Sequence, residues 1–177
     1  MEAAACAEGD GTMDRRGLKI AMGLAAAALL FAQPASAAMS CWGERETAAA
    51  KIRDLQSRLM VATLRCRAIG IDVLTEYNDF VRINRSTLQQ ANGVIKAQFD
   101  QGYGLEGARF YDSFTTALAN EYGADATSDA VCDETAAIAA EAALAEGDVA
   151  RLLDLADRTG RSPELPGGVC PITLTVR

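Results

Sequence analysis

Apolar or small residues recur in steps of three and four after residue 45, and this spacing restricts the fold more than any other feature. In the segment 46–70 the series is Ala48, Ile52, Leu55, Leu59, Ala62, Cys66 and Ile69. Such spacing puts the series on one face of an α-helix that packs along another helix. Asp54 and Arg58 stand four apart in the order that favours an ion pair along a helix, and Gly70 suits a left-handed helix end.

A second long helix is predicted to begin at Asp72, which suits the N-cap position. Its apolar face continues through Leu74, Tyr77, Val81, Asn84, Leu88, Ala91, Ile95 and Gln98. A polar Asn84 in this series has two interpretations. It is either buried and fixes the register of packing, or it lies at the edge of the apolar face, which we favour.

Shorter helices are predicted beyond a break at residues 101–107. One lies near 106–122, one follows a cap at Ser128 or Asp129, and one runs from about 149 to Gly160. The sequence therefore predicts an all-α fold, an up-down bundle of four to five helices over residues 38–160.

The last 17 residues, 161–177, contain three prolines and should form an extended C-terminal arm. Within this arm, residues 172–176 alternate between apolar residues and threonine, which is typical of a strand.

The N-terminus has the pattern of an export signal. A short charged region precedes an apolar run at 20–31, and Ala35-Ser36-Ala37 fits the site of signal peptidase. The apolar run is shorter than the roughly 20 residues that span a bilayer as a helix. We therefore expect residues 13–37 to be a signal peptide, residues 1–12 to lie before the true start, and no membrane anchor to remain after cleavage. The predicted location is the bacterial periplasm, with secretion from the cell as the alternative.

Four cysteines follow the predicted signal: Cys41, Cys66, Cys132 and Cys170. Export makes disulfides the expectation for an even set. Cys41 and Cys66 stand at opposite ends of the first helix, over about 30 Å apart, whereas bridged Cα atoms lie about 4.4–6.8 Å apart. In an up-down bundle the remaining helices bring Cys132 beside Cys66 and the arm brings Cys170 to Cys41. We therefore predict the bridges Cys66–Cys132 and Cys41–Cys170, with lipid attachment to Cys41 as the less favoured alternative.

The absence of histidine from the chain excludes several chemistries. Nucleophiles activated by histidine, histidine-ligated zinc and haem attachment all require this residue. Carboxylates remain, and four of them gather near the start of the predicted fourth helix: Asp125, Asp129, Asp133 and Glu134. Acids complement the positive end of a helix dipole, so we interpret the group as helix capping, with weak calcium binding as the alternative. We expect no catalytic residue, cofactor or metal site.

These features predict an exported, non-catalytic helical protein that acts by binding another protein. A net negative chain without a basic cluster does not favour nucleic acid as the partner. One alternative is a carrier of a small apolar ligand or lipid, with a pocket lined by Tyr77, Phe80, Phe110, Tyr111 and Phe114. A carboxylate enzyme that cleaves cell-wall glycans is the third and least favoured hypothesis.

Overall fold

The computed structural model describes residues 40–171. The predicted segments 1–12 and 13–37 and the strand-like residues 172–176 lie outside this range. The described part is all-α, with no strand, and contains both predicted disulfides. Its α-helices are α1 Glu44–Ala68, α2 Leu74–Ile83, α3 Arg85–Tyr103, α4 Gly107–Gly123, α5 Asp129–Ala143 and α6 Val149–Thr159.

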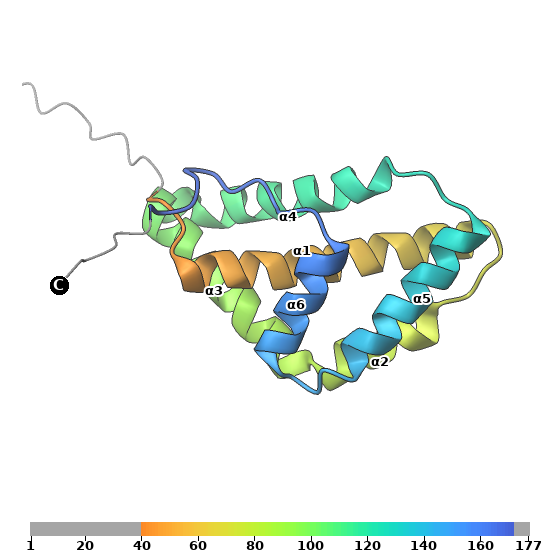
Figure 1. Cartoon of the computed structure of the whole chain (residues 1–177). Helices are drawn as coiled ribbons and strands as arrows, with labels where there is room; N and C mark the ends of the chain where they lie inside the picture. The colour runs from red at the N-terminus through yellow and green to blue at the C-terminus, as the bar shows by residue number, and fades with distance from the viewer. Residues whose placement is uncertain (1–39, 172–177) are drawn as a thin grey trace, which may run out of the picture. The chain divides into compact units, whose positions relative to one another are not determined.

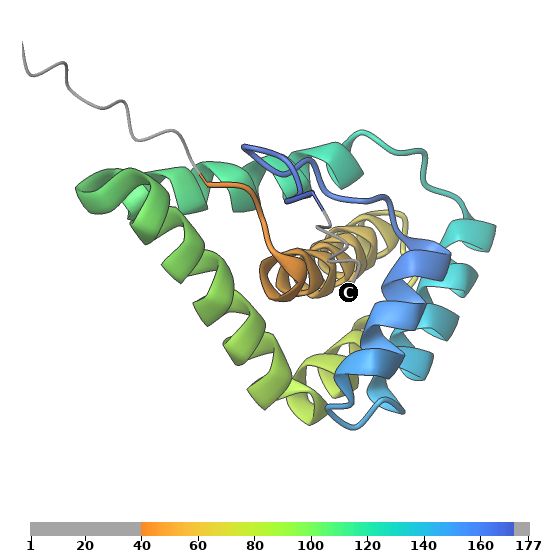
Figure 2. The same cartoon turned by 60° about the vertical axis from the view of Figure 1, so that its left-hand side comes forward.

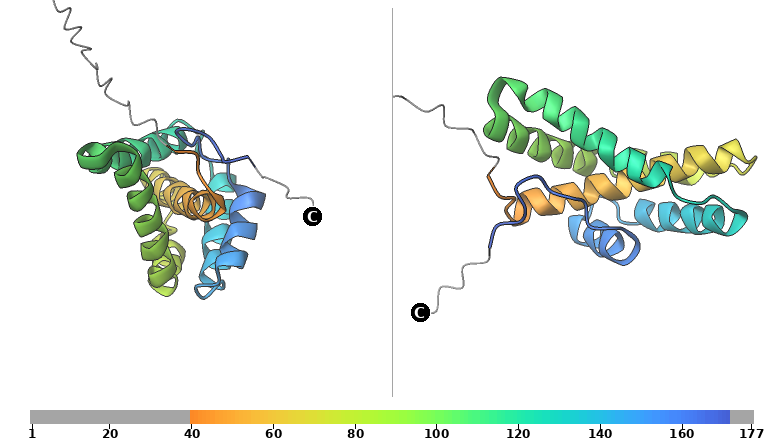
Figure 3. Two further views of the ribbon diagram at one scale, coloured as in Figure 1. Left: turned by 90° about the vertical axis from the view of Figure 1, so that its left-hand side faces the viewer. Right: turned by 90° about the horizontal axis from the view of Figure 1, so that it is seen from above.

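Helix α1 is the centre of the packing. Helices α3, α4, α5 and α6 all contact it, and they surround it when the bundle is viewed along its axis (Figure 2). Figure 3 shows the same arrangement from the end and from above. Because neighbours pack on several sides, α1 buries polar residues as well as its apolar series. Among the buried polar side chains are Asp54, Ser57 and Thr63.

The long second helix predicted from the sequence is two helices. Helix α2 ends at Ile83 and α3 begins at Arg85, so the chain changes direction at Asn84 (Figure 1). Asn84 is fully buried rather than at the edge of the apolar face. Its side-chain amide donates to the carbonyl oxygens of Phe80 and Ala142, and its Oδ1 accepts from the Gly147 N–H. Asn84 thus ties the α2–α3 junction to the α5–α6 turn.

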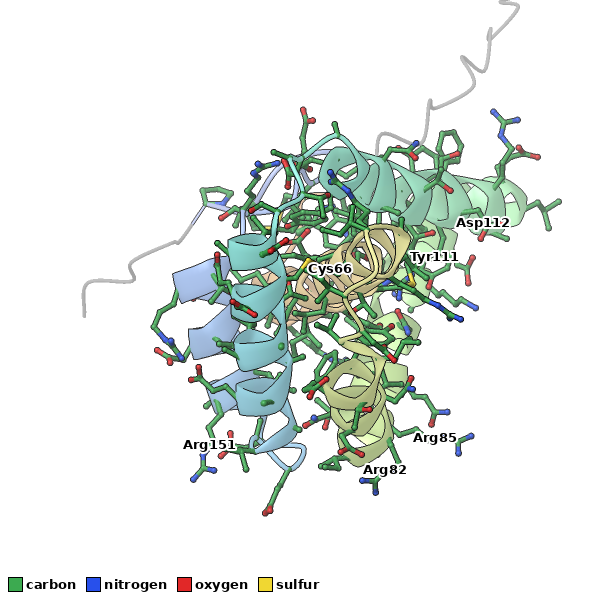
Figure 4. The ribbon with its side chains drawn as sticks, turned by 90° about the vertical axis from the view of Figure 1, so that its right-hand side faces the viewer. Cys66, Arg82, Arg85, Tyr111, Asp112 and Arg151 are labelled. Atoms are coloured by element: carbon green, nitrogen blue, oxygen red, sulfur yellow. A yellow bond between two sulfur atoms is a disulfide. The ribbon has the colours of Figure 1, made fainter. Side chains whose placement is uncertain are left out.

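The two disulfides join elements that are distant in sequence. Cys66 near the end of α1 bonds to Cys132 in the first turn of α5, and Cys41 bonds to Cys170 in the arm. Figure 4 shows Cys66 inside the bundle, whereas Arg82 and Arg85 point outward beside the α2–α3 junction and Arg151 points outward beside the start of α6. Gly70 has a φ of 89°, as expected for a left-handed helix end.

The arm is extended and packs back on the start of the domain. Val169 forms an isolated parallel β-bridge with Trp42. The backbone N–H of Trp42 donates to the Gly168 carbonyl at 2.8 Å, and the backbone N–H of Cys170 donates to the Trp42 carbonyl at 2.9 Å. The Trp42 ring is fully buried and packs against Phe99 and Phe114 in the main core. Both ends of the described chain are therefore fixed at the start of α1.

Candidate functional site

A groove of about 850 Å³ lies between the first half of α1, α3 and α6. Its floor contains Ala49, Ile52 and Ala91, each at most 6% exposed. Partly exposed aliphatic side chains form the walls, among them Val94 on α3 and Leu153 on α6. A volume of this size and an apolar lining are typical of ligand sites between helices.

The walls of the groove carry small residues. Ala48, Gly93 and Ala97 all line it, and a Cβ added at Gly93 would meet no atom within 4 Å. Val149 at the start of α6 is 47% exposed on the opposite wall. Small side chains allow the backbone of a bound segment to approach the helices closely, so the groove suits a peptide segment with an apolar face.

Polar side chains close the two ends of the groove. At one end Gln98, which is 6% exposed, donates to the carbonyl oxygens of Ser40 at 3.1 Å and Cys41 at 3.4 Å. At the other end Thr87 Oγ1 donates to the Gly147 carbonyl at 2.9 Å. These bonds attach α3 to the Cys41 disulfide region and to the α5–α6 turn, so both ends of the groove are held by the fold.

A second hollow, of about 1010 Å³, lies between α4 and residues 164–167 of the arm. Phe110 and Phe114 line it, together with Tyr103, whose ring stacks on Phe110. The predicted carrier pocket also included Tyr77, Phe80 and Tyr111. None of these three lines the hollow: Tyr77 and Phe80 lie on α2, and Tyr111 packs against Phe99 in the main core. The structure brings together two of the five aromatic residues proposed for a pocket.

The acidic group near the start of α5 is divided among separate partners. Asp125 accepts a hydrogen bond from Arg161 at 3.0 Å, and Glu134 accepts one from Arg58 at 3.1 Å. The N-cap of α5 is Ser128, whose side chain accepts from the Val131 N–H. Asp129 lies in the first turn of α5 and Asp133 is exposed on the same helix. Within residues 40–171 no group of three or more cysteine, histidine or carboxylate side chains is arranged to hold a metal ion.

A buried carboxylate on α1 is a further candidate site. Asp54 is 2% exposed, and its Oδ2 accepts a 2.7 Å hydrogen bond from the Tyr122 hydroxyl near the end of α4. A Cβ at Gly160, just after α6, would lie 3.4 Å from the same oxygen. Oδ1 has no hydrogen-bond partner within the described residues. The ion pair predicted between Asp54 and Arg58 does not form, because Arg58 pairs with a residue on α5 while Asp54 points into the core.

Burial is the main influence on the acidity of this carboxyl group. It raises the pKa of Asp54 from the ordinary 3.8 to about 6, and the hydrogen bond from Tyr122 lowers it in part. The Glu121 carboxylate raises the pKa further, whereas the positive charges of Arg58 and Arg161 lower it. Burial, followed by the bond to Asp54, also raises the pKa of the Tyr122 hydroxyl. Burial therefore raises the pKa of a carboxyl group that lies where α1, α4 and the end of α6 meet.

Sequence reasoning did not find either of these sites. The apolar part of the groove lining consists mainly of alanine and valine residues, which are typical of any packed helix face. The sequence spacing predicted that Asp54 pairs with Arg58 on the surface of the helix. Asp54 does not belong to the apolar series of α1, and only the packing of α4 and α6 on this helix shows that it is buried.

The disulfides indicate the compartment in which the protein folds. Structural disulfides form and persist in the periplasm or outside the cell. Among the residues that the structure describes, no helix is long and apolar enough to cross a membrane. Comparison of the chain with protein-family models, with curated proteins and with solved structures found no match in any of the three.

Proposed function

We propose that this protein is an exported, non-catalytic helical protein whose groove between α1, α3 and α6 binds an apolar segment of a partner protein in the periplasm or outside the cell. The groove is the observation that supports the proposal. It combines a buried aliphatic floor with small residues on its walls and with ends that are held by hydrogen bonds. Because the site is already formed in the free protein, less conformational entropy is lost when a partner binds.

The dimensions of the groove limit the segment that it accepts. The lining residues of α3 run from Thr87 to Gln101, which corresponds to about 21 Å of helix. A partner segment of about six extended residues or about 14 helical residues fits this length. The aliphatic floor favours a segment with apolar side chains along one face.

A site-resolved crosslinking experiment tests the proposal. A photoreactive amino acid at Ala97, on the groove wall, should crosslink to a partner in the native cells, whereas the same group at Thr116, exposed on α4, should not. Gly93→Trp fills the groove from a position with open space around it and should abolish the crosslink.

The matched control is Gly123→Trp, at the end of α4, where an added Cβ also meets no atom within 4 Å. Gly123 does not line the groove, so this variant should retain the crosslink. Equal crosslinking from both photoreactive positions, or a crosslink that survives Gly93→Trp, would exclude the groove as the binding site.

The hollow between α4 and the arm supports a second candidate function, a carrier of a small apolar ligand. Its aromatic residues Tyr103, Phe110 and Phe114 give it a lining suited to such a ligand. Native mass spectrometry of protein purified from its own cells tests this function. A carrier should retain a ligand mass that Phe110→Ala reduces, and a protein free of added mass would argue against it.

A further inference from the structure

The hollow between α4 and the arm has an apolar floor and an aromatic wall. Phe99, Phe114 and Leu118 form the floor, and each is at most 7% exposed. Tyr103 and Phe110 form the wall, with their stacked ring centroids 3.8 Å apart. Rings arranged in this way bind the apolar or aromatic body of a small molecule.

The arm on the other side of the hollow is held in place by the fold. Leu165 and Pro166 line the hollow, and the indole N–H of Trp42 donates to the Pro166 carbonyl at 2.7 Å. The arm is also attached to the start of the domain by the disulfide between Cys41 and Cys170. The hollow is therefore formed in the free protein, which limits the entropy lost when a ligand binds.

The charged side chains of the hollow lie away from its aromatic wall. Phe110 is near the start of α4 and Glu121 is near its end, so the two are about 16 Å apart along the helix. On the arm, Glu164 lies between Arg161, which reaches Glu121, and Pro166. A ligand that fills the hollow is thus elongated, with one end at the rings and the other at the carboxylates.

The charge at this end is negative. Among the described residues that line the hollow, Glu121 and Glu164 are the only charged ones, and both are exposed. Arg161 lies 3.6 Å from Glu121, but it also pairs with Asp125 at 3.0 Å. Glu164 forms no ion pair within residues 40–171. Three carboxylates and one guanidinium leave a net charge of −2 at this end of the hollow.

The aromatic end adds no net charge. The Arg109 guanidinium lies over the Phe110 ring at 5.5 Å, but it pairs with Glu106 at 3.2 Å and does not line the hollow. A fatty acid or another anionic amphiphile would therefore bring its negative group to the carboxylates, where like charges repel. An amphiphile with a positive group is attracted there.

We infer that the hollow binds an elongated organic cation. Its apolar or aromatic body packs against Phe99, Phe110 and Phe114, and its positively charged nitrogen lies beside Glu121 and Glu164. This step rests on the carrier proposed as the second candidate function, and it specifies the chemical class of the ligand.

Isothermal titration calorimetry of the purified protein with decyltrimethylammonium tests the inference. Decyldimethylamine oxide is the reference ligand, because it has the same chain and a head group of similar size without net charge at pH 7.5. Both are used below the concentrations at which they form micelles. The cation should bind about three- to tenfold more tightly than the amine oxide, as expected for two exposed carboxylates.

Glu164→Gln tests the charge at the site. It should weaken binding of the cation about two- to fivefold and leave binding of the amine oxide unchanged. The matched control is Asp112→Asn, which removes one exposed negative charge from α4 outside the hollow and should leave both affinities unchanged. Equal affinities for the two ligands, or equal effects of the two substitutions, would overturn the preference for a cation.

Phe110→Ala separates this inference from the carrier function. It should weaken binding of both ligands several-fold, because it removes part of the aromatic wall. Affinities that Phe110→Ala leaves unchanged would place the ligands elsewhere and overturn the inference. Equal affinities for both ligands that this substitution weakens would leave the carrier function standing and overturn only the preference for a cation. Absence of binding by either ligand, with no ligand mass in the native mass spectrum, would overturn both.

Discussion

The buried Asp54 carboxyl should make the stability of the protein fall as the pH rises from about 4 to about 6. The folded protein holds this proton with a pKa of about 6, compared with 3.8 for an ordinary aspartate. Between these values the folded state binds more protons than the unfolded chain, so the free energy of unfolding decreases with pH. The contribution is fully present below pH 3.8, is lost as the pH rises through about 6, and does not change further above that.

The size of the effect follows from the two pKa values. One pKa unit corresponds to about 1.4 kcal/mol, so the difference between 3.8 and about 6 is worth at most about 3 kcal/mol. Because Asp54 is only 2% exposed and Oδ1 is unpaired within the described residues, solvent screening reduces this value little. At pH 7.5 the folded protein should therefore contain a buried, charged Asp54 carboxylate, which destabilises it. The neutral variant Asp54→Asn avoids the cost of burying this charge.

Urea unfolding followed by Trp42 fluorescence measures the effect. The free energy of unfolding of Asp54→Asn, relative to the unsubstituted protein, should increase by about 2–3 kcal/mol between pH 4 and pH 7.5. The control is Asp157→Asn, which removes a carboxylate that is 54% exposed in a surface ion pair with Lys51. Such pairs contribute about 0–1 kcal/mol, so its curve should run parallel to that of the unsubstituted protein. Parallel curves for Asp54→Asn as well would refute the reasoning, because the folded carboxyl would then have an ordinary pKa.

Three further substitutions test other contacts of the fold. Asn84→Ala removes two buried hydrogen bonds and one partly buried hydrogen bond, and it should lower the free energy of unfolding by about 3 kcal/mol. Asn78→Ala, at an exposed position, should change it by less than about 0.5 kcal/mol in the same urea titration. Replacing Cys66 and Cys132 together by serine opens a loop of 66 residues and should lower stability by at most about 4 kcal/mol, and a loss no larger than that of a surface substitution would contradict the expected role of the bridge. Tyr122→Phe removes the hydrogen bond that lowers the pKa of the buried carboxyl, so the pH-dependent loss of stability should move to higher pH, and an unmoved profile would show that the bond has no such effect.

The helices and the cysteine pairing were predictable because each depends on local geometry. A helix of known length separates Cys41 from Cys66 by far more than a disulfide allows, and the order of the helices then leaves one consistent pairing, which the structure confirms. The break after residue 100 was also predictable, because three glycines interrupt the apolar series there.

The remaining features depend on how many neighbours each helix has. Asp54 and Ser57 lie outside the apolar series of α1, yet both are buried because α1 is surrounded on several sides. Asn84 fits an uninterrupted helix pattern, and the division into α2 and α3 depends on partners 58 and 63 residues away in the chain. The groove was not predictable either, because an alanine-rich helix face has the same sequence pattern whether it is covered or open.

The Cys41–Cys170 bridge closes residues 41–170 into a covalent ring, and the Cys66–Cys132 bridge divides that ring in two. A protease that cuts the ring once, for example after the exposed Arg67, leaves two fragments that both bridges still hold together. Such a nicked molecule migrates as one species until it is reduced. A protease outside the cytoplasm therefore cannot separate the two fragments with a single cut, because the disulfides keep them in one molecule.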